Sequence, residues 1–179
     1  AALESRQAVE LLRMCLDAGY DRAQTLTAVN GMMLLAGQGE RFTTVDLFLL
    51  DLWTGKASLD KLGAAGSYLM QAEGLSLLGG DALPLGILEN VESGEKLMQL
   101  HQGDTLILLS DGVEDAYENR QAMEEAIRDA LTLETAQDAA NAILTGAQSG
   151  DTAPADDQTV LVLRLIRARA DAKIEEMYQ

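Results

Sequence analysis

Residues 105–112 of the chain read TLILLSDG, an apolar run that leads directly into an acidic turn. Residues 156–163 read DDQTVLVL, where an acidic turn leads directly into an apolar run. We expect both apolar runs to be buried strands, and such strands can lie side by side in one sheet. A carboxylate at the end of a buried strand is costly unless a cation, a hydrogen-bond donor or water meets it. The two acidic turns therefore favour part of a hard-cation site, and with it a metal-dependent enzyme.

Outward from these turns, the sequence predicts helices around a set of mostly antiparallel strands. Helices are expected over residues 3–16, 21–36, 120–131 and 134–147, with a charged terminal helix to about residue 178. Strands are expected over residues 45–53, 56–62, 68–71, 75–78, 96–102, 105–109 and 159–166, with hairpin turns at Thr54-Gly55 and Gly103-Asp104. This order predicts an α+β layered sandwich with mostly antiparallel sheets, and it argues against a doubly wound fold.

The charge and length of the chain limit its class. Its 179 residues fit one domain, residues 1–179, and its 13 basic and 29 acidic residues give a net charge of −16. Such a field repels nucleic acid and anionic lipid, so we expect neither as a partner. Bound divalent cations would let an acidic protein act on a phosphate substrate. The single cysteine and the lack of an apolar run of about 20 residues favour a cytoplasmic location for this domain.

For three single residues, a structural role is favoured over a catalytic one. Cys15 lies on an apolar helix face and is expected to be a buried core thiol. His101, the single histidine, falls in an expected strand and is expected to be solvent-facing or satisfied rather than catalytic. Asp46 interrupts an apolar strand. It could be a polar edge of an active-site floor, but an ordinary hydrogen-bonded strand acid is favoured.

Six segments of the chain, taken in order, carry a family resemblance. They are residues 1–12, 42–52, 63–65 (GAA), 83–88 (LPLGIL), 110–113 (SDGV) and 156–160 (DDQTV). Together they resemble the phosphatase domain of stage II sporulation protein E (SpoIIE), a branch of the PPM family of metal-dependent serine/threonine phosphatases. The resemblance covers nearly the whole chain. It implies an α-β-β-α sandwich, in which two antiparallel sheets pack face to face with helices on both outer sides.

The resemblance also implies two divalent cations, Mn²⁺ or Mg²⁺, held by aspartates at one edge of the sandwich. By this resemblance Asp111 and Asp156 are metal ligands. Gly112 and Asp157 would support them without binding the metal directly, since many relatives carry Asn at the position of Asp157. Gln158 stands where the family usually has Met. No separate catalytic side chain is expected.

A departure from the family pattern lies at the beginning of the chain. Residues 1–5 (AALES) read as helix interior without a capping residue, and in the family they follow a segment beginning Asp-Gly-Met-Gly. That segment supplies the aspartate that bridges both metals. We therefore expect an N-terminally truncated fragment, in which metal occupancy and activity are reduced or absent.

The expected function is hydrolysis of phosphoserine on an anti-sigma-factor antagonist protein, in sporulation-type control of sigma factors. The parent protein would be membrane-anchored through upstream segments, with no membrane contact by this fragment. The alternative is a non-catalytic acidic interaction module, in which the first two helices form a docking or homodimer surface. A simple Ca²⁺-binding domain is disfavoured, because no twelve-residue EF-hand loop is visible.

Overall fold

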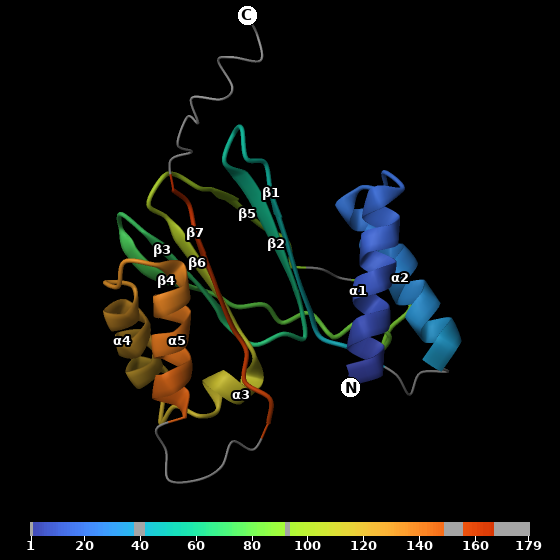
Figure 1. The fold of residues 1–179 in the computed structure, drawn as a ribbon. Coiled ribbons are helices and arrows are strands. Elements are labelled where there is room, and N and C mark those ends of the chain that lie inside the picture. The colour runs from blue at the N-terminus through green and yellow to red at the C-terminus, as the bar shows by residue number, and fades with distance from the viewer. Residues whose placement is uncertain (1, 38–41, 92–93, 149–155, 167–179) are drawn as a thin grey trace, which may run out of the picture.

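The computed structural model describes residues 2–37, 42–91, 94–148 and 156–166. Its helices are α1 (Ala2–Asp17), α2 (Arg22–Gly37), α3 (Asp111–Glu114), α4 (Arg120–Ala130) and α5 (Ala136–Ala147). Its strands are β1 (Val45–Leu50), β2 (Lys56–Leu62), β3 (Ser67–Gln71), β4 (Gly74–Leu78), β5 (Lys96–Gln99), β6 (Thr105–Leu109) and β7 (Val160–Arg164). They form two antiparallel sheets, ordered β1-β2-β5 and β4-β3-β6-β7, between two helical layers (Figure 1). The α+β layered sandwich is confirmed.

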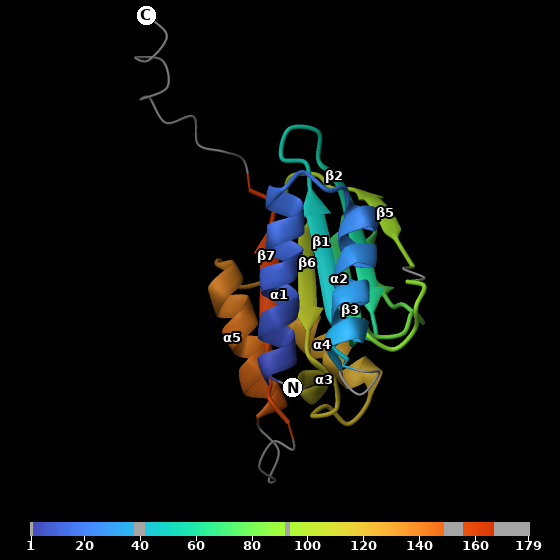
Figure 2. The same ribbon diagram turned by 90° about the vertical axis from the view of Figure 1, so that its right-hand side faces the viewer.

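Helices α1 and α2 cover the outer face of the β1-β2-β5 sheet (Figure 2). Ala8, Leu12 and Cys15 recur at helical spacing on α1 and are buried, which confirms the core thiol. The turn before α2 contains a capping box. Asp21 Oδ1 accepts the Gln24 N–H at 2.8 Å, and Gln24 Oε1 accepts the Asp21 N–H at 3.0 Å.

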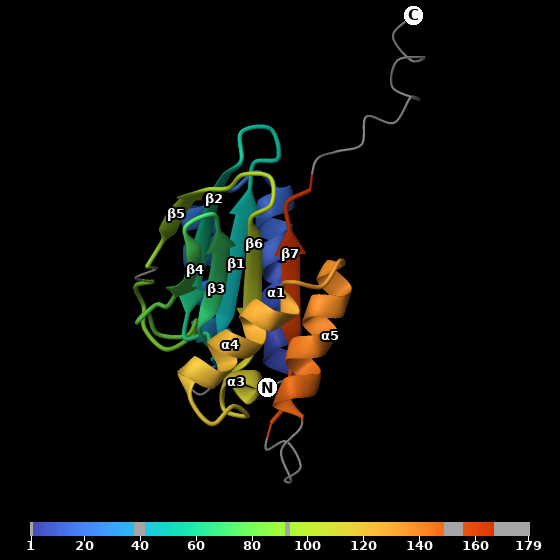
Figure 3. The same ribbon diagram turned by 90° about the vertical axis from the view of Figure 1, so that its left-hand side faces the viewer.

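Helices α4 and α5 cover the outer face of the other sheet (Figure 3). Each begins at a capping side chain: Asn119 Oδ1 accepts the Ala122 N–H at 3.0 Å, and Thr135 Oγ accepts the Asp138 N–H at 3.0 Å. Strand β6 is buried on both faces, as its apolar run predicts. Its residue Ile107 packs under these helices. Residues on the other face of the strand meet the opposite sheet. No helix in the described ranges is both long and apolar enough to cross a bilayer.

The first strand is shorter than predicted. Strand β1 ends at Leu50, and residues 51–55 form the turn to β2, because the Asp51 carboxylate accepts the N–H groups of Trp53 (2.8 Å) and Thr54 (3.2 Å). Trp53 is therefore 97% exposed rather than part of a buried strand. An aspartate that binds its own downstream amides ends a strand even when apolar residues follow.

The hairpin predicted for residues 96–109 is also wrong. Strand β5 pairs with β2, whereas β6 pairs with β3 and β7, so the chain crosses between the sheets over residues 100–104. His101 lies in this crossing rather than in a strand. The short helix α3 was not predicted. The expected terminal helix and most of the loop before residue 156 lie outside the described residues.

Candidate metal centre

The turn after β6 carries the first predicted metal ligand. Ser110 has an extended backbone (φ −81°, ψ 160°) and precedes α3, whose first residue is Asp111. Asp111 is exposed, and its Oδ1 accepts the N–H of Gly112 at 2.9 Å. Within the described part of the chain, the other oxygen of Asp111 makes no hydrogen bond or ion pair. That oxygen is therefore open to an ion or to water.

Strand pairing brings the second acidic turn alongside the first. Leu109 of β6 is opposite Val160 of β7, so the residues just beyond them meet. The N–H of Ser110 donates to the carbonyl of Thr159 at 3.0 Å, and the N–H of Thr159 donates to Ser110 Oγ at 2.9 Å. Ser110 Oγ in turn donates to the Asp157 carbonyl at 3.1 Å. Ser110 therefore joins the two turns through both its backbone and its hydroxyl.

Gly112 is where the two backbones come closest. A Cβ added at Gly112 would lie 2.5 Å from the carbonyl oxygen of Asp157 and 3.2 Å from that of Asp156. Side chains do not fit at such separations, so this position requires glycine. Gln158 Nε2 also donates to the Gly112 carbonyl at 3.1 Å. Asp111 and Asp156 thus lie on touching backbone segments at one edge of the sheet, as the two strand ends predict.

The second predicted ligand, Asp156, is held in the same way as the first. It is exposed, and its Oδ1 accepts the N–H of Asp157 at 2.7 Å. Its other oxygen has no hydrogen bond or ion pair to any described residue. Two carboxylates that each keep a free oxygen suit Mg²⁺ or Mn²⁺, which bind carboxylate oxygens together with several waters.

The described residues supply only part of a ligand set. Among residues 2–37, 42–91, 94–148 and 156–166, no three or more Asp, Glu, His or Cys side chains gather in a group that could hold a metal. The donor chemistry at Asp111 and Asp156 fits a divalent cation, with further ligands from water or from residues beyond these ranges. The roles of Asp111, Asp156, Gly112 and Asp157 at a metal therefore stay predictions.

One cavity adjoins the candidate centre, and a second shares a lining residue with it. One, of about 280 Å³, is lined by Asp111, Ser110 and Thr159 together with Asp46 of β1. The other, of about 1130 Å³, is bordered by the loop of residues 79–91. Ala64 lines both cavities, whereas no residue of the two acidic turns lines the larger one.

Sequence reasoning missed the partner of Asp46. Lys61 on β2 is directly opposite Asp46 on β1, and its Nζ donates to Asp46 Oδ1 at 2.7 Å. The same Nζ donates to Ser67 Oγ on β3 at 2.8 Å. The favoured explanation of Asp46 as a hydrogen-bonded strand acid is confirmed, and its carboxylate also lines the smaller cavity. Only the pairing register of β1 with β2 could have identified Lys61 in advance.

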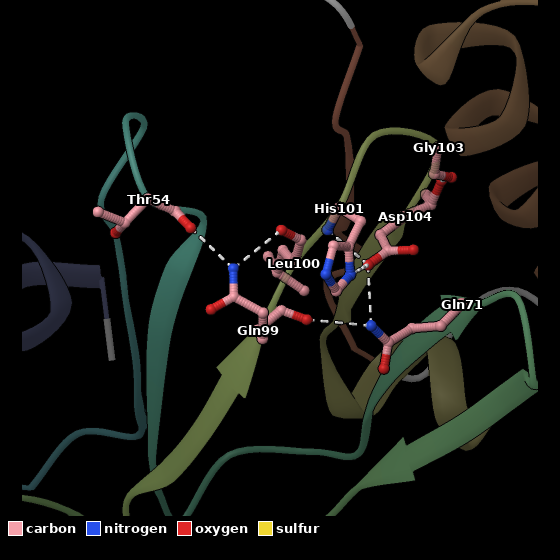
Figure 4. A network of polar contacts seen from close by, with 8 residues as sticks. Thr54, Gln71, Gln99, Leu100, His101, Gly103 and Asp104 are labelled. Carbon is pink, nitrogen blue, oxygen red and sulfur yellow. Dashed lines mark hydrogen bonds and ion pairs between the residues drawn. The ribbon is translucent and has the colours of Figure 1, made fainter.

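The single histidine has no part in this centre. The side chain of His101 is 71% exposed and lies beside Asp104, with Nδ1 3.7 Å from Asp104 Oδ2 (Figure 4). Asp104 lies at the beginning of β6, at the opposite end of the strand from Asp111. The expectation of a solvent-facing histidine is confirmed, although it lies in a turn and not in a strand.

Comparison with known proteins assigns the family. The family model described as Stage II sporulation protein E (SpoIIE) matches residues 1–166. The chain belongs to the SpoIIE family. A curated relative, stage II sporulation protein E of Priestia megaterium, is 29% identical over 113 residues, which are 63% of this chain and 19% of that protein. The chain therefore spans less than a fifth of this SpoIIE relative.

Solved structures confirm the fold. The PP2C phosphatase domain of SpoIIE from Bacillus subtilis, solved with a fragment of its regulatory domain, superposes with a TM-score of 0.79 at 26% identity. The match covers 91% of this chain and 50% of that one. The catalytic domain of the serine/threonine protein phosphatase PstP, in complex with two manganese ions, gives a TM-score of 0.75 at 19% identity. It covers 93% of this chain and 82% of that one. This SpoIIE-family chain therefore has the sandwich fold of PP2C-type phosphatases.

Proposed function

We propose that this SpoIIE-family chain is a metal-dependent protein serine/threonine phosphatase domain. The observation that carries the proposal is the contact between the two acidic turns, 110–112 and 156–159. Ser110 and Gly112 hold these turns together, and each turn presents one aspartate with a free carboxylate oxygen. Family membership and the PP2C-type fold support this assignment.

In this proposal, residues of the chain bind the cation and orient the carboxylates that hold it. Asp111 and Asp156 would hold a divalent cation through their free oxygens, while the amides of Gly112 and Asp157 fix the orientation of each carboxylate. Bound divalent cations supply the charge and the activated water that hydrolysis of a phosphate ester needs. The neighbouring cavity of about 280 Å³ gives the reacting phosphate a place partly screened from bulk water.

The substrate is a phosphoserine on a protein, namely a phosphorylated anti-sigma-factor antagonist on the cytoplasmic side. The larger cavity supports a protein substrate, because about 1130 Å³ exceeds the need of a single phosphoserine and the cavity shares Ala64 with the one that Asp111 lines. Lys96 and Arg120 on its wall could contact acidic groups around the phosphoserine. A phosphorylated antagonist protein should then be hydrolysed faster than free phosphoserine at equal concentration.

Residues 1–179 alone should be less active than the full encoded protein. The described residues offer two carboxylates at this edge and no larger ligand group. A binuclear centre of the kind seen in manganese-bound PstP requires more ligands than these. Assays of both polypeptides at equal concentration of Mn²⁺ would measure the difference.

The decisive experiment measures Mn²⁺-dependent release of phosphate from a phosphoserine protein by the full encoded protein. Asp111→Asn and Asp156→Asn should each abolish most of this rate. Asp129→Asn, which makes the same charge change on the exposed surface of α4, should leave it unchanged. A rate without metal dependence, or one unaffected by Asp111→Asn, would contradict the proposal.

A docking role for α1 and α2 is the second candidate. Apolar side chains stand exposed on both helices, including Val9 (63%) and Met14 (66%) on α1 and Leu35 (86%) on α2. Sedimentation at several concentrations tests a homodimer. A strict monomer that binds no partner would remove this candidate.

A further inference from the structure

A buried lysine lies between the two sheets near the candidate centre. The side chain of Lys61 is 1% exposed, and its ammonium donates to Asp46 Oδ1 at 2.7 Å and to Ser67 Oγ at 2.8 Å. Ser67 Oγ also donates to Asp46 Oδ2 at 3.4 Å. We call these three residues the Lys61 cluster. Every pair within it is joined by a hydrogen bond, so the three side chains are held in one arrangement.

The Lys61 cluster joins the two sheets. Asp46 and Lys61 are opposite each other in β1 and β2, whereas Ser67 belongs to β3 of the other sheet. Ser67 is opposite Leu108 of β6, and Asp111 follows three residues later in the chain. The ammonium therefore links the sheets at the end of β6 that leads into the Asp111 turn.

The cluster also borders the space in front of Asp111. Asp46 and Asp111 line the same cavity of about 280 Å³, and no basic side chain is among its lining residues. Without Lys61, the Asp46 carboxylate would be an uncompensated charge beside the candidate ligands. It would repel Asp111 or compete with it for a cation.

The energetics of such a pair favour a role beyond stability. A buried ion pair usually stabilises a fold no better than apolar side chains of similar volume. The core between the sheets is otherwise apolar, with Leu69 and Leu106 almost fully buried. An apolar pair would therefore suit the fold, whereas the ion pair keeps the Asp46 carboxylate compensated where it borders the cavity.

We propose that the Lys61 cluster is a positioning element for the divalent-cation site. Lys61 neutralises Asp46 beside Asp111, and through Ser67 it ties β2 to β3, the strand that pairs with the end of β6 leading to Asp111. The inference rests on the proposed metal-dependent function. None of the three cluster residues touches the cation in this arrangement.

The test separates positioning from stability in the full encoded protein, with Mn²⁺ alone as the probe. Lys61→Met leaves the partly buried Asp46 carboxylate without its cationic partner, so both the Tm and the affinity for Mn²⁺ should fall. The double variant Asp46→Leu/Lys61→Met replaces the pair with apolar side chains. It should regain the parent Tm to within a few degrees while its Kd for Mn²⁺, measured by electron paramagnetic resonance, stays at least tenfold higher.

Two further variants complete the design. Ser67→Ala keeps the ion pair within one sheet but removes the link to the other, so it should raise the Kd for Mn²⁺ several-fold with a small change in Tm. Arg128→Met breaks the surface ion pair to Glu124 on α4, whose N–O distance is 3.1 Å, and should change neither quantity.

The outcomes distinguish the two proposals. If the double variant regains both the Tm and the Mn²⁺ affinity, the cluster serves stability alone and this inference is overturned. If Lys61→Met increases the affinity or the number of bound Mn²⁺ ions, Asp46 is itself a ligand and the inference is likewise overturned. If the parent protein binds no Mn²⁺, the proposed function fails, and this inference fails with it.

Discussion

Both ends of the sandwich carry aspartates at strand ends, but these carboxylates differ in burial and in the hydrogen bonds they accept. At one end, which we call the hairpin end, lie residues 51–55 and 99–104. There Asp104 is 6% exposed, and its Oδ2 accepts the N–H of His101 and Nε2 of Gln71, each at 2.8 Å (Figure 4). This carboxylate fixes the crossing between the two sheets.

At the other end, the α3 end, lie residues 110–112 and 156–159. Asp111 and Asp156 are exposed there, and among the residues that the structure describes each accepts only the amide of the next residue. This comparison indicates that the hydrogen-bond donors around a carboxylate determine whether it stabilises the fold or can bind a cation. A buried carboxylate surrounded by donors serves the fold, whereas an exposed one with a free oxygen is available to a cation.

The largest effect is expected at Gly112, where one substitution should damage both the fold and the site at the α3 end. In Gly112→Ala the new Cβ would overlap the Asp157 carbonyl, 2.5 Å away, and force the two turns apart. We expect a loss of about 1–3 kcal/mol in the free energy of unfolding, together with loss of Mn²⁺ binding. Urea unfolding and Mn²⁺ titration measure the two effects.

The matched control is Gly31→Ala in helix α2, where an added Cβ meets no atom within 4 Å. It should stabilise the protein by about 0.5–1 kcal/mol, because alanine loses less backbone entropy in a helix. A Gly112→Ala variant as stable as the parent, with Mn²⁺ binding intact, would show that the two turns do not touch.

The second prediction compares one aspartate from each end of the sandwich. Asp104→Ala removes the charged acceptor shared by the His101 N–H and Gln71 Nε2 and should cost about 1–3 kcal/mol of stability. It should leave the Mn²⁺ dependence of the phosphatase rate unchanged. Asp111→Ala should change stability by less than about 0.5 kcal/mol but lower that rate by roughly 100-fold. Equal stability losses at the two positions would erase the contrast between the ends.

The third prediction concerns two tyrosines in the core beneath α4 and α5. Tyr117 donates its hydroxyl to the Ile143 carbonyl at 2.8 Å, whereas the buried hydroxyl of Tyr68 has no partner among the described residues. Tyr117→Phe should therefore cost about 1 kcal/mol in the free energy of unfolding, and Tyr68→Phe should cost about 0.5 kcal/mol or less. Urea unfolding of both variants at neutral pH measures the difference.

The same tyrosines predict an alkaline loss of stability. Burial raises the pKa of Tyr68 and of Tyr117 above the usual value of 10.0, and nearby Glu124 and Glu114 raise that of Tyr68 further. A raised native pKa contributes stability that is complete below about pH 10 and is lost as the pH rises through the native value. Each Phe variant should flatten this decline. An unchanged alkaline slope in both would contradict the assignment.

The smallest effect is expected at Asp51, at the hairpin end. Hydrogen bonding to the Thr54 side chain, and then to the amides of Trp53 and Thr54, lowers the pKa of Asp51. A lowered pKa contributes stability at pH values above the ordinary pKa of aspartate. This contribution is lost as the pH falls through the native pKa. Asp51→Ala should therefore lower the Tm slightly at pH 7 and make less difference in strong acid. A Tm difference that persists in strong acid would indicate packing rather than charge.

Most of the fold could be predicted from the sequence because its signals are local. The helical spacing of Ala8, Leu12 and Cys15 depends on residues a few positions apart. The predictions were wrong where strand pairing depends on contacts between segments far apart in the sequence. Residues 96–109 contain two strands and a turn, and only the partners β2 and β3 show that the strands belong to different sheets.

The register of the first hairpin shows the same limit. A two-residue turn at Thr54-Gly55 would have placed Asp46 opposite Gly63. The actual turn of residues 51–55 shifts the pairing by two residues and places Asp46 opposite Lys61. The Lys61 cluster could not be identified from the sequence, because its existence depends on this shift and on the approach of the other sheet at Ser67.

The sequence by itself determined the strand-end position of Asp111 and Asp156, the apolar strands that end there, and the resemblance to the family. These follow from residue type and short spacing. Only the tertiary structure decided that the two turns touch at Gly112, that Asp104 is enclosed by donors, and that a buried lysine pairs with Asp46. The physical reason is that contact, burial and charge compensation depend on which segments meet in space.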